Sequence, residues 1–272
     1  MKLSALVLAR NEEQHLPYTL EALKNQTLPL NQIIVVNDGS TDQTRKIALQ
    51  HGCQIIDLPF HRENYAGTPK IAELLNVGLR QVREALPDYI VQLGADHVLS
   101  SAYVETIVYR MEQDTNLVLV TGFIEGEPSD PGSPRGSGRV IKTSFFQHFC
   151  DLQYPETWCW EEWLPYKALQ LGFKIRCFMD VSSTVTRATF GLRGNEGKTM
   201  YELGYHYTTV LGRCLLGFKV SPKNTVKILW DWLRHKGLRR MPLAKWVNQT
   251  QASQFNSRFF KFVNRFMGKI LK

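Results

Sequence analysis

The sequence predicts an α/β fold, with a mostly parallel sheet flanked by helices and a basic helical extension at the C-terminal end. Short apolar runs alternate along the chain with stretches of helical periodicity, which is the pattern of parallel strand–helix units. The 272 residues are 43% hydrophobic and 11% aromatic, so the chain can bury a sizeable core and is not intrinsically disordered. Charge is divided unevenly between a long body and a shorter C-terminal segment.

The N-terminal part of the chain is expected to form alternating strands and helices. Each predicted strand is a short apolar run that ends in polar or turn-forming residues. The predicted strands cover residues 3–9, 32–37, 53–57 and 88–93, and the predicted helices cover residues 12–25, 40–51 and 68–85. Ligands bind at the carboxyl ends of parallel strands. We therefore expect Asn11, Asp38 and Asp96, which follow three of these strands, to share one crevice.

The middle of the chain is expected to contain further strands at residues 117–124 and 173–178. An aromatic-rich helix is predicted over residues 158–171, interrupted by Pro165 because proline cannot donate a helical hydrogen bond. Residues 125–139 read EGEPSDPGSPRGSGR, and this composition predicts a mobile loop that cannot form a helix or a central strand. Such a loop can close over a bound ligand, although a plain surface insertion has the same composition.

The five cysteines are widely spaced and include no C-x-x-C pair. This pattern disfavours a zinc site or a disulfide framework and fits a reducing compartment. We also expect no membrane-spanning helix, because no uncharged apolar stretch reaches about 18 residues.

Residues 219–272 form the basic extension. Residues 1–218 carry 20 basic and 24 acidic side chains, a net charge of −4, whereas residues 219–272 carry 13 basic side chains and one acidic one, a net charge of +12. Near the end, apolar residues recur with helical spacing at positions 259, 262, 263, 266, 267, 270 and 271, and basic residues fill much of the rest. This predicts an amphipathic helix in an anionic membrane interface, with packing on the core or in a dimer as the alternative. Nucleic acid is not an expected partner, because the body contains no RNA- or DNA-binding motif.

Acidic residues at the predicted strand ends suit the binding of a nucleotide or a metal ion. Asp38, in the sequence NDGSTD, can accept a hydrogen bond from a uracil or guanine N–H, although an Asx turn explains it equally well. Asn11 and Glu12 are open to two interpretations, a helix cap and a ribose contact. Asp96, beside His97, offers an oxygen ligand to a cation that bridges phosphates, or an N-cap for the following helix.

An acidic pair, Glu161–Glu162, lies among three tryptophans in the sequence WCWEEW. A carboxylate in such surroundings can act as a general base. The alternative is an acidic first helical turn that faces solvent.

In their order along the chain, these motifs resemble the family-two glycosyltransferases, which have the Rossmann-like GT-A fold. The resemblance covers roughly residues 1–200, and NDGSTD is highly characteristic of the family. The matching segments are LVLARNEE, VVNDGSTDQT, NYAG and NVG within residues 64–78, LGADH at 93–97, and WEEW with LGFKI at 160–175. The resemblance implies a glycosyltransferase domain over residues 1–218, with a nucleotide-binding half (1–97) and an acceptor half (98–218).

The resemblance also implies roles for the residues that bind the donor. Ala9, Arg10 and Glu12 would line the nucleotide base and ribose, and Asp38 would bind the base. Lys70 lies in the region that often contributes a basic group to the nucleotide.

The metal and base motifs depart from the family pattern. Asp96 matches the last aspartate of the D-x-D metal motif, but the first acid is replaced by Gly94. Asp96 and His97 would then hold Mg²⁺ or Mn²⁺. A gapless count back from Gly172 places Glu161 at the catalytic aspartate of the family, whereas direct alignment of the acidic pairs places Glu162 there. We favour Glu161.

The implied reaction is an inverting transfer of a sugar from a UDP- or GDP-sugar to an acceptor hydroxyl. Together with the basic extension, it predicts a lipid-linked or membrane-bound acceptor and a peripheral location on the cytoplasmic face of the membrane. One rival is a nucleotidyltransferase, which would need a Gly-rich basic loop after the first strand. Another is a degenerate protein that binds a nucleotide-sugar without transferring it, since the metal motif is incomplete.

Overall fold

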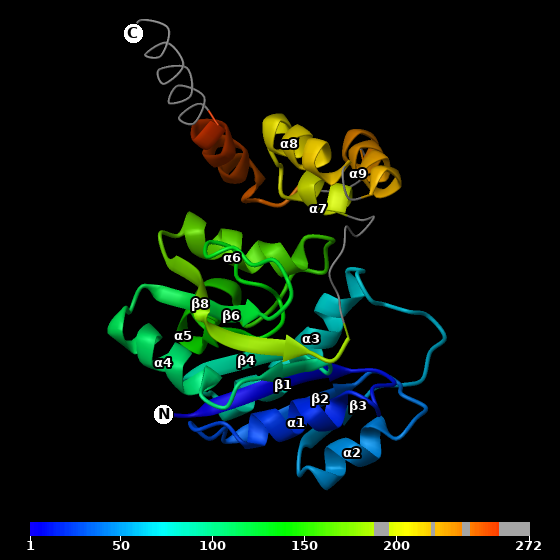
Figure 1. The fold of residues 1–272 in the computed structure, drawn as a ribbon, viewed down its shortest axis with the longest axis vertical. Coiled ribbons are helices and arrows are strands. Elements are labelled where there is room, and N and C mark those ends of the chain that lie inside the picture. Colours follow the sequence, from blue (N-terminus) through cyan, green and yellow to red (C-terminus); the bar gives the residue numbers. More distant parts are fainter. Residues whose placement is uncertain (188–195, 219–220, 236–239, 256–272) are drawn as a thin grey trace, which may run out of the picture. The chain divides into compact units, whose positions relative to one another are not determined.

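The computed structural model describes residues 1–187, 196–218, 221–235 and 240–255 (Figure 1). The chain divides into two compact units. The first comprises Met1–Glu156 and Trp160–Phe190, and the second comprises Thr157–Cys159 and Gly191–Lys272. The second unit thus begins before residue 219 and includes a short segment from the middle of the chain.

The described residues of the first unit contain an eight-stranded sheet. Its strands are β1 (Leu3–Ala9), β2 (Gln32–Asn37), β3 (Gln54–Asp57), β4 (Tyr89–Gly94), β5 (His97–Leu99), β6 (Leu117–Ile124), β7 (Arg139–Lys142) and β8 (Lys174–Val185). They lie in the order β3-β2-β1-β4-β7-β6-β8-β5. Strands β1 to β4 are parallel, as are β6 and β8, whereas β7 and β5 are antiparallel to their neighbours. The prediction of a mostly parallel α/β sheet is therefore confirmed.

Helices cover both faces of this sheet (Figure 1). They are α1 (Leu16–Lys24), α2 (Thr44–Gln50), α3 (Lys70–Ala85), α4 (Tyr103–Gln113), α5 (Thr143–Cys150) and α6 (Trp160–Gln170). Apolar side chains of α1, α2 and α4 join one core cluster, and those of α3, α5 and α6 join the other. Successive strand residues alternate between the clusters: Ala5 and Val7 belong to the first and Leu6 to the second. Because helices cover both faces, β1 and β6 are apolar over most of their length.

The strand β7 contradicts the prediction that residues 125–139 form a loop up to Arg139. It lies between β4 and β6, in the middle of the sheet. Val140 and Ile141 are fully buried, and Arg139 is buried as well. The loop prediction holds for residues 125–138 and was wrong at Arg139, because an arginine after a Gly- and Ser-rich stretch does not indicate burial.

Two other elements also differ from the prediction. β8 continues beyond residue 178 to Val185, because after a register shift its second half also pairs with β5. α6 passes through Pro165 without interruption.

The second unit is helical in its described part. It contains α7 (Glu196–Glu202), α8 (Tyr207–Gly217), α9 (Pro222–Arg234) and a helix over residues 244–255. The side chain of Glu202 accepts a hydrogen bond of 3.0 Å from the backbone N–H of Cys159, and the Thr199 hydroxyl donates one of 2.8 Å to the carbonyl of Trp158. These bonds attach the Thr157–Cys159 segment to α7.

Several predictions concern the C-terminal segment. The amphipathic helix expected near residues 258–272 lies outside the described residues. No helix in the described part of the chain is long and apolar enough to span a bilayer. All five cysteines are free thiols.

Candidate active site

The carboxyl ends of β1, β2 and β4 lie side by side, as expected for the binding edge. Ala9 at the end of β1 pairs with Asn37 of β2, and Leu8 pairs with Gly94 of β4. Hydrogen bonds tie the loops after β1 and β2 together, because Thr41 donates its backbone N–H to Asn11 Oδ1 (2.8 Å). The sequence motifs at these strand ends therefore form one continuous rim.

Asp38 lies in a network of basic side chains on this rim. Its Oδ1 is 2.8 Å from Nε2 of His61, and its Oδ2 is 3.8 Å from Nη1 of Arg10. The His61 ring stacks on Tyr65 with a centroid distance of 4.2 Å. Asp38 is buried, so its carboxylate is fixed rather than freely solvated.

The other predicted donor-binding residues take different positions. Ala9 is buried, and its carbonyl accepts the backbone N–H of Asp38 (2.9 Å). Lys70 opens α3 and forms an ion pair with Glu73, and its Nζ lies 5.8 Å from the centre of the Tyr65 ring. Through Tyr65 and His61, Lys70 lies at the edge of the Asp38 network.

Asp96 and Glu12 share one cation, Arg187. The Nη2 atom of Arg187 donates a hydrogen bond of 2.8 Å to Glu12 Oε1 and one of 3.3 Å to Asp96 Oδ2. This position is fixed by the backbone, because Thr186 donates its N–H to the Asp96 carbonyl (2.9 Å). Both carboxylates thus pair with one guanidinium, which lies just after the end of β8.

His97 is buried beside this group. Burial lowers the pKa of His97 to about 4, so the ring is neutral at physiological pH. Its Nδ1 is 2.7 Å from the Ser137 hydroxyl, whereas its buried Nε2 has no hydrogen-bond partner among the described residues. Ser137 also accepts the backbone N–H of Gly94 (2.9 Å). Ser137, in the loop before β7, therefore links the end of β4 to His97 at the start of β5.

Asp96 is the main candidate ligand for a divalent metal ion. In the described residues, no three His, Cys, Asp or Glu side chains are grouped to hold a metal ion. A carboxylate at position 94 would have little room, since a Cβ there would lie 3.0 Å from Asp96 Oδ1. Mg²⁺ commonly binds one or two carboxylates and completes its shell with substrate phosphates and water. Asp96 fits such a site when a diphosphate supplies further ligands.

Glu161 lies in the first turn of α6 and reaches the loop before β7. Its Oε1 accepts the backbone N–H of Gly136 at 3.0 Å. A Cβ at position 136 would lie 2.4 Å from the same oxygen, so only glycine leaves room for this contact. Glu162 is exposed. Glu161 is therefore joined to the Asp96 turn through two consecutive loop residues, Gly136 and Ser137.

The backbone of Glu161 is held by a buried arginine. Pro165 has no N–H, so the carbonyl of Glu161 lacks its usual helical partner four residues later. Arg139 Nη2 supplies a donor to that carbonyl at 3.2 Å, and Arg139 Nε bonds the Arg135 carbonyl at 2.9 Å. The arginine in β7 thus supplies the hydrogen-bond donor that the proline removes from α6.

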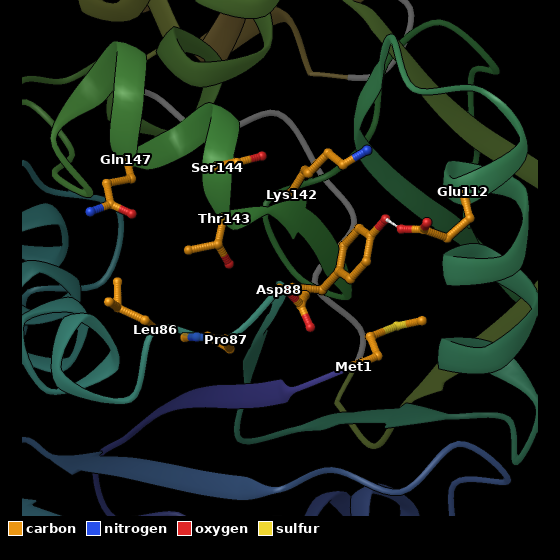
Figure 2. A pocket seen from close by; sticks show the side chains of 10 residues that line it. Met1, Leu86, Pro87, Asp88, Glu112, Lys142, Thr143, Ser144 and Gln147 are labelled. Carbon is orange, nitrogen blue, oxygen red and sulfur yellow. Dashed lines mark hydrogen bonds between the residues drawn. The ribbon is translucent and has the colours of Figure 1, made fainter.

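A separate cavity of about 450 Å³ lies at the opposite end of the sheet (Figure 2). It is lined by Met1, Leu86, Pro87, Asp88, Tyr89, Glu112, Lys142, Thr143, Ser144 and Gln147. These residues lie near the amino ends of β1 and β4, and none is a predicted site residue. Because parallel sheets bind ligands at the carboxyl ends of their strands, we place the candidate site at the carboxyl ends of β1, β2 and β4.

Comparison with known proteins identifies the family. The sequence model described as Glycosyl transferase family 2 matches residues 4–167. The chain belongs to glycosyl transferase family 2. A relative of this family-2 chain, the 4,4'-diaponeurosporenoate glycosyltransferase of Staphylococcus aureus, is 38% identical over 56 residues. That match covers 21% of this chain and 15% of the length of the relative.

Solved structures similar to this family-2 chain are GT-A glycosyltransferases. The mannosyltransferase PcManGT from Pyrobaculum calidifontis, in complex with GDP-Man and Mn²⁺, has a TM-score of 0.58 at 15% identity, covering 94% of this chain and 74% of that one. S. aureus TarS 1-349 with UDP-GlcNAc has a TM-score of 0.56 at 17% identity, covering 88% and 74%. The match to a longer TarS chain covers 44% of that chain. At these identities the likeness shows the fold, which is GT-A.

Sequence reasoning missed three residues that contact the candidate site of this family-2 chain: His61, Arg139 and Arg187. His61 and Arg187 lie outside the predicted motifs, and only chain folding brings them to Asp38 and Asp96. The signal for Arg139 was indirect: a proline inside a predicted helix requires a donor from elsewhere.

Proposed function

We propose that this chain is an inverting glycosyltransferase that moves a sugar from a nucleotide-diphospho-sugar to an acceptor hydroxyl. The observation that carries the proposal is the placement of Glu161, whose carboxylate is linked through Gly136 and Ser137 to the turn that bears Asp96. A base and a diphosphate site must lie near each other for a direct displacement. Family membership supports the same chemistry.

In the proposed reaction, Glu161 accepts the proton of the acceptor hydroxyl as its oxygen attacks the anomeric carbon. The bond between that carbon and the nucleoside diphosphate breaks at the same time, which inverts the configuration. The backbone N–H of Gly136 donates a hydrogen bond to Oε1 of Glu161 and so orients the carboxylate.

We propose a UDP- or GDP-sugar as donor. Asp38, held by His61 and Arg10, would accept an N–H of the base, and Ala9, Glu12 and Lys70 would line the nucleotide. PcManGT in complex with GDP-Man and TarS with UDP-GlcNAc support both nucleotide classes. Mg²⁺ or Mn²⁺ at Asp96 would add positive charge beside the diphosphate; the PcManGT complex also contains Mn²⁺.

We further propose that the acceptor is lipid-linked or membrane-bound, with the enzyme on an anionic, cytoplasmic membrane face. The helix α9 supports this, because Val226, Trp230 and Leu233 recur at i, i+4 and i+7 and are 57%, 53% and 58% exposed. Lys223 and Arg234 are also exposed on this helix. Apolar residues flanked by cations are typical of helices that lie in a membrane interface.

The test of the transfer reaction is a paired substitution. Glu161→Gln should reduce transfer by about 10²–10⁴-fold, because general base catalysis contributes that much. Its affinity for the donor should stay unchanged, and Glu162→Gln should keep its activity. Loss of activity in Glu162→Gln alone would show that the base is assigned wrongly. Tight binding of nucleotide-sugars without any turnover would favour a binding protein over an enzyme.

A further inference from the structure

Part of the positive charge beside Asp96 comes from the protein itself. The family motif for a metal ion lacks its first acid, and the space near position 94 is occupied by Asp96 Oδ1, 3.0 Å from a Cβ built there. The neighbouring His97 is buried against Ser137. The cation that contacts Asp96 is the guanidinium of Arg187, at 3.3 Å.

Arg187 is suited to bind more than the two carboxylates. Its side chain is 53% exposed, whereas the side chains of Glu12 and Asp96 are only 12% and 14% exposed. Both of its ion pairs use Nη2, and its other nitrogens make no hydrogen bond to a described residue. A guanidinium has five N–H donors in a planar fork that matches phosphate oxygens. Arg187 can therefore contact a phosphate with donors that the carboxylates leave available.

The charges around Asp96 also favour a contact between Arg187 and a phosphate of the donor. Glu12 and Asp96 carry two negative charges, and Arg187 balances one of them. A nucleoside diphosphate adds further negative charge, which a metal ion at Asp96 alone would have to neutralise. Charge-assisted hydrogen bonds from Arg187 to the phosphates would neutralise part of this negative charge.

We propose that Arg187 binds the diphosphate of the nucleotide donor and stabilises its charge as it leaves. This inference rests on the proposed donor class and adds a catalytic residue to it. The reaction consequently depends less on a divalent metal than in a site with a complete D-x-D motif. Arg187 acts from the end of β8, where the pairing of β8 with β5 holds the backbone next to Asp96.

Binding experiments on the full chain can isolate this contact. Titration calorimetry with UDP and with uridine, each in Mn²⁺ and in EDTA, compares the wild type with Arg187→Gln and Arg187→Lys. GDP and guanosine form the second pair of ligands. Arg176→Gln is the matched control, since Arg176 is an exposed arginine on β8, the strand that leads to Arg187.

Arg187→Gln should weaken diphosphate binding by about tenfold or more, because hydrogen bonds to charged groups are lost. The loss should be larger in EDTA than in Mn²⁺, and Arg187→Lys should recover part of it. Binding of the nucleoside without phosphates should not change, and Arg176→Gln should match the wild type.

Two results would overturn the inference. One is an Arg187→Gln protein that binds UDP and GDP as tightly as the wild type does. The other is an equal loss of nucleoside and nucleoside diphosphate affinity, which would indicate a purely structural role. If the wild type binds no nucleoside diphosphate, the proposed donor class fails first, and this inference fails with it. Thermal unfolding of each variant shows whether it is folded, and Arg187→Lys preserves the charge if the glutamine variant is not.

Discussion

Glu161 is held at its carboxylate and at its backbone. The Gly136 N–H binds Oε1, and the Arg139 guanidinium binds the carbonyl. In its proposed role as the base, Glu161 would lose little conformational entropy when the acceptor binds.

Substitution of Gly136 tests whether this fixation matters. A Cβ at position 136 would lie 2.4 Å from Glu161 Oε1 and would push the carboxylate away. We expect Gly136→Ala to lower kcat by about a hundredfold, which is the effect of a displacement of roughly 1 Å in a catalytic group. The KM for the donor should remain unchanged, as measured by steady-state kinetics.

Gly132→Ala is the control for this substitution in the same loop. A Cβ there would approach only the Asp130 side chain, at 3.3 Å. An equal loss of kcat in both variants would mean that the loop as a whole, rather than the contact to Glu161, is disturbed.

His97 makes stability depend on pH. Its folded-state pKa of about 4 lies below its ordinary value of 6.5, so the unfolded chain binds a proton before the folded protein does. Its stabilising contribution is therefore complete above about pH 6.5 and is lost as the pH falls towards 4. The loss amounts to about 3 kcal/mol at most, from 1.36 kcal/mol for each pKa unit.

Urea unfolding in EDTA at several pH values measures this contribution. The free energy of unfolding of the wild type should fall more steeply between pH 6.5 and 4 than that of His97→Asn, which cannot take up the proton. Parallel curves for the two proteins would contradict the burial of a neutral imidazole.

At the scale of elements, β7 and α6 depend on each other. Pro165 deprives the Glu161 carbonyl of a helical donor, and Arg139 in β7 replaces that donor. Arg139→Met should destabilise the protein by about 3 kcal/mol, because several backbone carbonyls lose their partner. In a Pro165→Ala background the new N–H can bind the Glu161 carbonyl, so the same substitution should cost about 1 kcal/mol less.

A double-mutant cycle in urea measures this coupling. Strictly additive effects of Arg139→Met and Pro165→Ala would show that the two residues act independently.

The elements that the sequence predicted well are those whose residues are nearly all buried. The strands at residues 3–9, 32–37 and 117–124 match the structure at both ends, since they are almost wholly buried. β7 was missed because its buried arginine is compensated by backbone carbonyls of the preceding loop and of Glu161, which no sequence pattern indicates. β5 has only three residues and no periodicity to detect. The second half of β8 was missed because Asp180, Ser182 and Ser183 interrupt its apolar pattern.

In the candidate site, too, residues in local sequence motifs could be predicted, whereas residues brought in from elsewhere in the chain could not. Asp38, Asp96 and Glu161 could be singled out as candidates because the chemistry of each lies in a local motif, and their roles stay predictions. His61 and Arg187 were not, because their roles arise from a loop and a strand end that reach the rim from elsewhere in the chain.

At the scale of the whole molecule, positive charge and exposed apolar residues gather in the second unit. In α8, Tyr207, Leu211 and Leu215 recur every four residues and are 57%, 48% and 71% exposed. Trp230 of α9 is also exposed, and the Arg234 guanidinium lies 3.7 Å from the centre of its ring. These residues add an apolar surface to the basic extension expected from the sequence.

Sedimentation with vesicles tests whether this surface binds membranes. The full chain should bind vesicles that contain phosphatidylglycerol and should bind phosphatidylcholine vesicles more weakly, because about 1 kcal/mol is gained for each cation near an anionic surface. Raising the salt concentration should weaken binding to the anionic vesicles. Leu215→Ser combined with Trp230→Ser should reduce binding to both.

Tyr109→Ser is the control, since Tyr109 is 65% exposed on α4 of the first unit. If the paired substitution leaves vesicle binding unchanged but abolishes self-association in light scattering, the surface is a contact between copies of the chain.

The segment Thr157–Cys159 has a practical consequence for dissecting the protein. It is bonded to α7, yet it leads directly into the helix that carries Glu161. A fragment that ends near residue 190 would leave Cys159, which is fully buried, and the backbone of Trp158 without these partners. Fusions or chimaeras that exchange the C-terminal unit would therefore also alter the segment that leads into α6. For protein engineering, the transferable part of this chain is the two units together.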